Sequence, residues 1–222
     1  MLWDGVRAGL PICLGYIPIG LAFGVIAQKA GLGPLEIAMM SILVFAGSSQ
    51  FIAVSMISSG AEILSVIITT FMVNLRHFLM SSSLSRFSGN KRGGFLSVFS
   101  YGITDESFAV NLSRFTQNEW DMNRALVVNQ TANLVWILST VAGGIGSQFI
   151  PQKAFGIDYA LIAMFICLLV FQLRGNLYVV TAVIAAVMAV GFALFIPGNS
   201  YIIIASMTAA TIGVLIKSRV RR

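Results

Sequence analysis

Charged residues are scarce in this sequence: only 10% of its 222 residues are Asp, Glu, Lys or Arg. A soluble domain carries about 25%, so the composition excludes an ordinary soluble protein. Two cysteines and one histidine give no basis for a disulfide framework or a metal cluster, and we expect no metal and no cofactor. The net charge of +6 comes without basic patches interleaved with aromatic residues, so we expect no nucleic-acid partner.

Long apolar runs are abundant instead, and 57% of the residues are hydrophobic. A run of about 20 apolar residues crosses a bilayer as a helix. No polar block is long enough to fold separately, and no signal cleavage site follows the first run. We therefore predict an all-α fold, a polytopic helical membrane protein with one membrane domain over residues 1–222. The seven predicted spans are Val6–Gln28, Leu35–Ser59, Ala61–Leu84, Ala125–Ile150, Ile157–Leu173, Asn176–Ile196 and Tyr201–Ile216.

The segment Phe95–Arg114 is barely long enough to span, and it either crosses the membrane or dips in and returns. If it returns, eleven Lys and Arg residues fall on one side and two on the other, with Arg76 inside a span. If it crosses, the split is eight against five. Because cytoplasmic loops carry the excess of Lys and Arg, the returning arrangement is favoured. It predicts an outside N-terminus and an inside C-terminus.

Asp105 and Glu106 lie side by side in this segment, in a sequence with only eight acidic residues. An ionised carboxylate at the bilayer centre costs roughly 2.5–3.5 kcal/mol on insertion scales. One interpretation is a short helix at the membrane surface with Thr104 as its N-cap. The other is a break between two short helices that line a transport path, where Asp105 or Glu106 carries a proton.

The first predicted span is interrupted by glycine and proline. Pro18 cannot donate a hydrogen bond, so it frees a backbone carbonyl one turn earlier. Discontinuous helices often build binding sites in transporters, whereas a kinked helix with small residues packs closely against its neighbours. Both interpretations stay open at this point. Tyr16, next to the interruption, could offer its hydroxyl to a ligand.

Polar side chains also occur in the middle of other predicted spans. Ser48, Ser49 and Gln50 favour either tight helix packing or a polar lining, and the lining is preferred because the Gln50 amide has three hydrogen-bonding groups to satisfy. Asn74 and Arg76 lie in the third span. Arg76 either reaches the interface along its long side chain or turns inward and pairs with a carboxylate.

A polar stripe marks the span Ala125–Ile150. Asn129, Asn133 and Trp136 are spaced so that they share one helix face. A polar stripe on a membrane helix faces protein or a cavity rather than lipid. We therefore predict that these three residues belong to the ligand site.

Five motifs in order resemble the AzlC family of bacterial inner-membrane permeases. They are Gly9-Leu10-Pro11-Ile12 with Gly15-Tyr16-Ile17-Pro18, then Phe45-Ala46-Gly47-Ser48-Ser49-Gln50-Phe51, Asn74-Leu75-Arg76-His77, Thr104-Asp105-Glu106-Ser107-Phe108 and Gly156-Ile157-Asp158-Tyr159-Ala160. The resemblance covers about residues 5–170. It implies a multi-pass permease of the bacterial inner membrane that exports leucine, isoleucine and valine, with methionine as a further candidate. It also implies a separate small AzlD-like membrane subunit as partner.

The residues suggest how a proton-coupled exporter would hold a branched-chain amino acid. Arg76 or the interrupted first span could receive its carboxylate. The candidate acceptors for its ammonium are Asp105, Glu106, Gln50 and Asn133, and the candidate apolar wall is Phe23, Phe51 and Trp136. The alternatives are a channel or a structural subunit of a membrane complex. An intramembrane enzyme is less favoured, because His77 adjoins no nucleophile motif. The sequence shows no direct repeat, and an inverted pair of halves flanking Phe95–Arg114 is a further hypothesis.

Overall fold

The computed structural model describes residues 2–89, 91–149, 175–195 and 200–220, and positions 159, 163, 166, 169, 170 and 173. All secondary structure in these residues is helical, which confirms the all-α prediction. Four of the helices are long and apolar enough to cross a membrane: α1 (Leu2–Lys29), α4 (Ile63–Ser85), α7 (Met122–Gly146, continued by the short turn η1, Ser147–Phe149) and α9 (Asn176–Phe195). The predicted span Ile157–Leu173 lies mainly outside the described residues.

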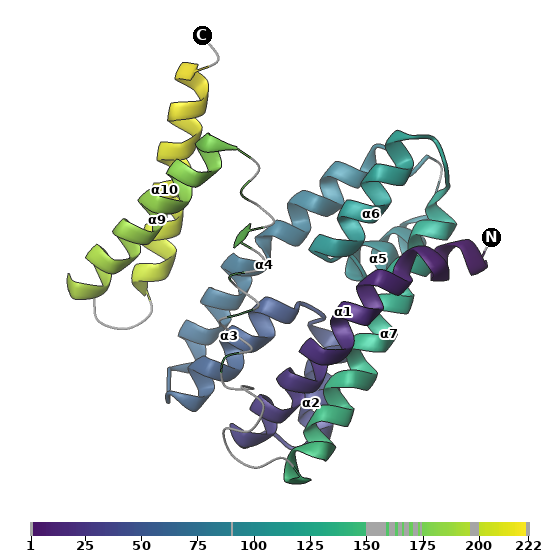
Figure 1. The fold of residues 1–222 in the computed structure, drawn as a ribbon, viewed down its shortest axis with the longest axis horizontal. Helices are drawn as coiled ribbons and strands as arrows, with labels where there is room; N and C mark the ends of the chain where they lie inside the picture. The colour runs from purple at the N-terminus through teal and green to yellow at the C-terminus, as the bar shows by residue number, and fades with distance from the viewer. Residues whose placement is uncertain are drawn as a thin grey trace.

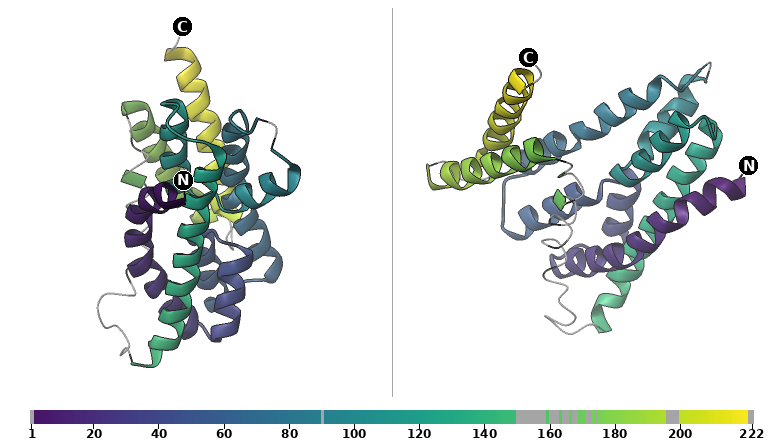
Figure 2. Two further views of the ribbon diagram at one scale, coloured as in Figure 1. Left: turned by 90° about the vertical axis from the view of Figure 1, so that its right-hand side faces the viewer. Right: turned by 45° about the horizontal axis from the view of Figure 1, so that its top comes forward.

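Helices α1 and α7 run parallel, side by side (Figures 1 and 2). Their close contact requires glycine at the points where the backbones meet. A Cβ added to Gly24 would lie 2.0 Å from the Thr140 carbonyl oxygen, and one added to Gly143 would lie 2.2 Å from the Leu21 carbonyl oxygen. Small residues let helix backbones approach this closely. Helix α1 is continuous through Pro18. The break considered there is therefore absent, and the close-packing interpretation holds.

The segment Leu35–Ser59 is not one span, as predicted, but two short helices, α2 (Pro34–Leu43) and α3 (Gly47–Ser58). The start of α2 lies beside the end of α7, where Ile37 meets Gly144. Further along the chain, Ser41 bonds Thr140 at 2.8 Å and the bend reaches Trp136. α3 then turns back, with Val54 in the same core cluster as Ala27. The pair thus enters from one end of the molecule and returns to it.

A second pair of short helices enters from the opposite end. Helix α5 (Gly93–Tyr101) begins where Lys91 bonds Asn123 at the start of α7, and it reaches Asn129 at Phe99. Helix α6 (Asp105–Thr116) returns, and Phe115 packs with Met122. The predicted segment Phe95–Arg114 therefore dips in and returns, as the charge count favoured.

The chain thus contains two similar units that point in opposite directions. The first unit is α1 followed by the pair α2 and α3, and the second is α4 followed by α5 and α6. The boundary lies between α3 and α4, rather than at Phe95–Arg114 as the inverted-repeat hypothesis had it. We call residues 44–49 the neutral bend and residues 102–107 the acidic bend. Helix α10 (Ser200–Val220) pairs with α9 (Figure 1), and α10 also contacts α4.

The two returning pairs change the predicted orientation. Asp4 of α1 lies 3.6 Å from Arg124 of α7, so the N-terminal end shares one end of the molecule with the loops around α5 and α6. The predicted placement of the N-terminus opposite those loops is wrong, because it assumed that Leu35–Ser59 crosses. We call the end that holds the start of α1 and the loops around α5 and α6 the basic end. Its described cations are Arg7, Arg86, Lys91, Arg92, Arg114 and Arg124. By the positive-inside rule, we expect this end on the cytoplasmic side.

Candidate functional site

The neutral and acidic bends meet halfway along the long helices, around a small cavity. Its volume is about 50 Å³, whereas pockets for small molecules run to roughly 300–1,000 Å³. Six of the predicted site residues line it: Tyr16, Ser48, Arg76, Asp105, Glu106 and Trp136. His77 and Thr104 line it too, and neither of them was predicted as a site residue.

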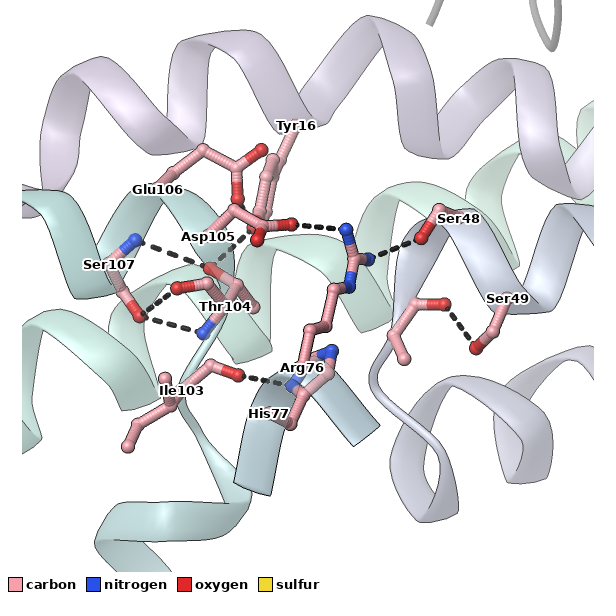
Figure 3. A network of polar contacts seen from close by, with 11 residues as sticks. Tyr16, Ser48, Ser49, Arg76, His77, Ile103, Thr104, Asp105, Glu106 and Ser107 are labelled. Carbon is pink, nitrogen blue, oxygen red and sulfur yellow. Dashed lines mark hydrogen bonds and ion pairs between the residues drawn. The ribbon is translucent and has the colours of Figure 1, made fainter. Parts of the chain in front are cut away.

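Arg76 connects the two bends. Its Nη1 lies 2.6 Å from Asp105 Oδ2, and its Nη2 donates to the Ser48 hydroxyl (Figure 3). Both charged side chains are half-buried, at 28% and 31% exposure. Of the two interpretations of Arg76, the inward one holds, and the predicted pairing with Asp105 is confirmed. A single guanidinium can make these two contacts because its donors form a rigid planar fork.

The acidic bend begins helix α6 with a capping box. Ser107 N donates to Thr104 Oγ1 at 3.3 Å, and Thr104 N donates to Ser107 Oγ at 2.9 Å. Asp105 and Glu106 follow in the first turn, where the helix dipole favours negative charge. Thr104 is thus the N-cap, as one interpretation had it. The cap lies in the middle of the molecule, at a break between two helices, as the other interpretation had it.

Tyr16 links α1 to the acidic bend. Its hydroxyl lies 2.8 Å from Thr104 Oγ1 and 2.7 Å from Glu106 Oε2 (Figure 3). A phenol has one proton to donate, so it serves one of these oxygens at a time. An ionised Glu106 accepts that hydrogen bond in preference to Thr104, because charge-assisted hydrogen bonds are the stronger ones. Glu106 is the more exposed of the two acids.

His77 presents a free basic nitrogen at this site. Its Nδ1 lies 2.8 Å from the Ile103 carbonyl oxygen, which can only accept, so Nδ1 carries the proton in the neutral ring (Figure 3). The other nitrogen, Nε2, is buried and has no hydrogen-bond partner within the described residues. Its position next to Arg76 was the one signal in the sequence that could have suggested this residue.

The neutral bend is held by Ser49 and by the neighbouring Gln50. Gln50 Oε1 accepts from Ala46 N at 3.3 Å and from Trp136 Nε1 at 3.0 Å, while Gln50 Nε2 donates to Ser41 Oγ at 3.3 Å. Ser49 Oγ donates to the Ala46 carbonyl at 2.9 Å. Gln50 and Ser49 are fully buried and lie outside the cavity. The preferred lining role of Gln50 is therefore not what the structure shows: the amide is satisfied by packing partners.

Three other predicted residues also lie outside the cavity. Asn129 Nδ2 donates to the Phe99 carbonyl at 3.1 Å and its Oδ1 accepts from Asn111 at 2.9 Å, while Asn133 donates to the Tyr101 hydroxyl at 3.2 Å. These contacts attach α5 and α6 to α7. Asn74 Oδ1 is buried without a hydrogen-bond partner among the described residues. Of the predicted apolar wall, Trp136 borders the cavity, whereas Phe23 and Phe51 pack in the core.

The two bends present different electrostatics to the same cavity. Helix α3 begins at Gly47 with no side-chain cap, and Gly47 and Ser48 of its first turn line the cavity, so this helix start brings no charged group of its own. Helix α6 begins with two carboxylates of its own. With Arg76 between them, the site offers positive groups on one side and negative groups on the other. That polarity matches a small zwitterion.

Comparisons with known proteins agree with a membrane location. The family model described as AzlC protein matches residues 11–150. The inner membrane protein YgaZ of Escherichia coli is 29% identical over 84% of this chain and 80% of its own length. The branched-chain amino acid transport protein AzlC of Bacillus subtilis is 27% identical over 96% of this chain and 85% of its own. An uncharacterized membrane protein of Archaeoglobus fulgidus is 30% identical over 86% and 84%. No solved structure matches the chain.

Proposed function

The chain belongs to the AzlC family of membrane transport proteins, and we propose that it exports branched-chain amino acids across the bacterial inner membrane in exchange for protons. Leucine, isoleucine and valine are the proposed substrates, with methionine as a further candidate. The name of the Bacillus relative supports the substrate class. The export direction and the proton coupling rest on the family resemblance and on the chemistry of the central cavity.

The observation that carries this proposal is the contact of Arg76 with both bends. Arg76 pairs with Asp105 of the acidic bend and with Ser48 of the neutral bend, midway along the spanning helices. A charge at this depth is expensive unless it serves a polar path or a bound ligand. Any substrate that moves through the centre must therefore exchange with one of these two contacts.

We place the substrate carboxylate at the start of α3. The Ser48 hydroxyl is a neutral partner for Arg76, so a carboxylate can replace it with a gain in charge-assisted bonding. The uncapped first turn of α3 adds amide donors and the positive end of the helix dipole. The equivalent turn of α6 is already occupied by Asp105 and Glu106, so it does not compete for the carboxylate.

The substrate ammonium is then directed to the acidic bend. Glu106 is the proposed partner, because Asp105 is engaged by Arg76 whereas Glu106 contacts a neutral hydroxyl. Proton uptake by Glu106 removes the charge that holds the ammonium, and the Tyr16 hydroxyl is then free to turn to Thr104. Binding of a proton and binding of the substrate thus exclude each other at one carboxylate, which is the requirement for exchange.

The cavity also indicates that the bends must move. A volume of about 50 Å³ holds only a few water molecules, not a branched-chain amino acid. Admission of the substrate therefore requires the neutral and acidic bends to separate. We further propose, from the family resemblance, that a small AzlD-like membrane subunit works with this chain.

The test is transport in proteoliposomes that contain the purified chain, with and without the small subunit. Counterflow of radiolabelled leucine against internal unlabelled leucine identifies a carrier. We expect counterflow in the wild type and its loss in Asp105→Asn, with membrane insertion unchanged. Leucine flux without counterflow would support a channel instead, and no flux with either preparation would support a structural subunit. Full transport by both Asp105→Asn and Glu106→Gln would overturn the proposed mechanism.

A further inference from the structure

A second, larger pocket lies at the basic end, away from the central cavity. Its volume is about 410 Å³, and it opens between the first turns of α1, the end of α6 and the start of α7. The N-terminus and these helix ends gather on the same side of the molecule in Figure 1. The polar and aromatic residues that line it are Asp4, Arg7, Arg114, Glu119, Trp120 and Arg124. The proposed transport path uses none of them.

The pocket has an excess of hydrogen-bond donors over acceptors. Three arginines face two carboxylates, and Arg114 is paired with Glu119. Arg124 Nε is 3.6 Å from Asp4, too far for a hydrogen bond, and it is buried without a hydrogen-bond partner in the described part of the chain. Arg7 is exposed and makes no ion pair with any described residue. The pocket therefore has unused capacity for an anion.

The pocket also lies at the depth of the lipid headgroups. Helix α1 has 28 residues and is about 42 Å long at 1.5 Å per residue, whereas the hydrocarbon core is about 30 Å thick. Its first turns therefore extend into the interface. Trp3 and Trp120 lie there, the first under Arg7 and the second under Arg114, and tryptophan is enriched at this level of the membrane.

We propose that this pocket binds the phosphate of an anionic phospholipid headgroup in the cytoplasmic leaflet, with Arg7 and Arg124 as its principal ligands. Guanidinium groups bind phosphate oxygens in pairs. Basic pockets between membrane helices on the cytoplasmic side are suited to such headgroups. A soluble phosphate ester offers the same chemistry, but the interfacial depth and the two tryptophans favour the lipid.

The experiment is native mass spectrometry of the full chain in detergent, titrated with dioleoylphosphatidylglycerol, dioleoylphosphatidylcholine or glycerol 3-phosphate. The test variant is Arg7→Gln, which removes no ion pair of the described chain, so we expect the fold to stay intact. The matched control is Arg86→Gln, which removes the same charge from the same end but lies outside the pocket. Arg124→Gln is a second test variant inside the pocket.

We expect the anionic lipid to bind more tightly than the zwitterionic one, and Arg7→Gln to weaken its binding about fivefold, the typical contribution of one arginine near an anionic surface. Arg86→Gln should leave it unchanged. Equal losses in Arg7→Gln and Arg86→Gln would overturn the site in favour of general surface charge, and equal binding of both lipids would overturn it as well. Tight binding of glycerol 3-phosphate with the same variant pattern would support the phosphate site and assign it to a soluble ligand. None of these outcomes depends on transport.

Discussion

The neutral and acidic bends occupy equivalent places in the two units, but they are stabilised in different ways. The acidic bend starts α6 with a capping box and two carboxylates. The neutral bend starts α3 without a side-chain cap, and its Phe45 has a φ of 37°, a conformation that bulky residues rarely adopt. Gln50 holds that conformation in place through Ala46, Ser41 and Trp136.

The two bends differ in how many of their polar side chains hold the backbone and how many face the cavity. The neutral bend uses its polar side chains to satisfy its own backbone, and it keeps only Ser48 for the cavity. The acidic bend satisfies its backbone with Thr104 and Ser107, which leaves Asp105 and Glu106 for Arg76 and Tyr16 and, in the proposed function, for the substrate. An inverted pair with one charged and one uncharged member distinguishes the two ends of a zwitterion, which a symmetric pair would not.

Removing the Arg76 side chain, which bonds to both bends, should have the largest effect. We expect Arg76→Gln to lower the rate of leucine counterflow about 100-fold, as for the loss of a charge-assisted contact of roughly 3 kcal/mol. Arg76→Lys keeps the charge but loses the planar fork, so its counterflow rate should lie between those of the wild type and Arg76→Gln. Wild-type rates in Arg76→Gln would show that the bends work without a bridge.

Neutralising the acidic bend should separate proton-driven transport from exchange. In Glu106→Gln we expect leucine transport driven by a pH gradient to fall about tenfold, a change of about 1.4 kcal/mol, because the side chain can no longer take up a proton. Counterflow at equal pH on both sides should fall less, since an amide oxygen can still accept from the ammonium. If the two activities fall in parallel, Glu106 binds substrate but does not carry the proton.

Disturbing the neutral bend should affect stability before transport. Gln50→Leu leaves the indole of Trp136 and the amide of Ala46 buried without acceptors, at about 1–3 kcal/mol each. The unfolding temperature in detergent should therefore drop by several degrees. The matched control is Gln117→Leu at the exposed end of α6, which should change it little. An unchanged unfolding temperature in Gln50→Leu would refute the structural role.

The smallest effect should come from the one cavity hydroxyl of the neutral bend. Ser48→Ala removes a neutral partner of Arg76 and leaves the ion pair with Asp105, so we expect the KM for leucine to change about fivefold or less, near 1 kcal/mol. Ser49→Ala is the control, because that hydroxyl bonds its own backbone away from the cavity. Equal changes in both variants would contradict the assignment of Ser48 to the site.

The acidic bend could be predicted because charged residues are rare in this sequence as a whole. Two adjacent carboxylates in an apolar chain need partners, and the requirement led to Arg76 and to a helix break at Thr104. The neutral bend gives no such signal. The residues Val44, Phe45 and Ala46 are apolar, and nothing local indicates the positive φ of Phe45. The hydropathy of Leu35–Ser59 therefore predicted one continuous span, and the orientation followed that error.

The polar residues of the site show a similar limit. Sequence patterns predicted that Gln50, Asn129 and Asn133 face protein or a polar cavity rather than lipid, and all three are buried in the protein. Whether a buried amide faces a cavity or a packing partner depends on residues far away in the chain, such as Trp136 for Gln50 and Tyr101 for Asn133. Pro18 left both a broken and a continuous helix open, and the structure shows the continuous one, because a membrane helix can continue through a proline when its neighbours satisfy the backbone.

The glycine contacts between α1 and α7 also bear on how access to the centre can alternate. Two helices whose backbones touch at Gly24 and Gly143 cannot slide past each other without separating. Tyr16 and Trp136, one on each helix, are therefore fixed relative to one another, 5.3 Å apart between ring centroids. If the proposed transport is right, we expect these two helices to stay fixed while α4 and the two bends move, with Arg76 linking the movements of the bends.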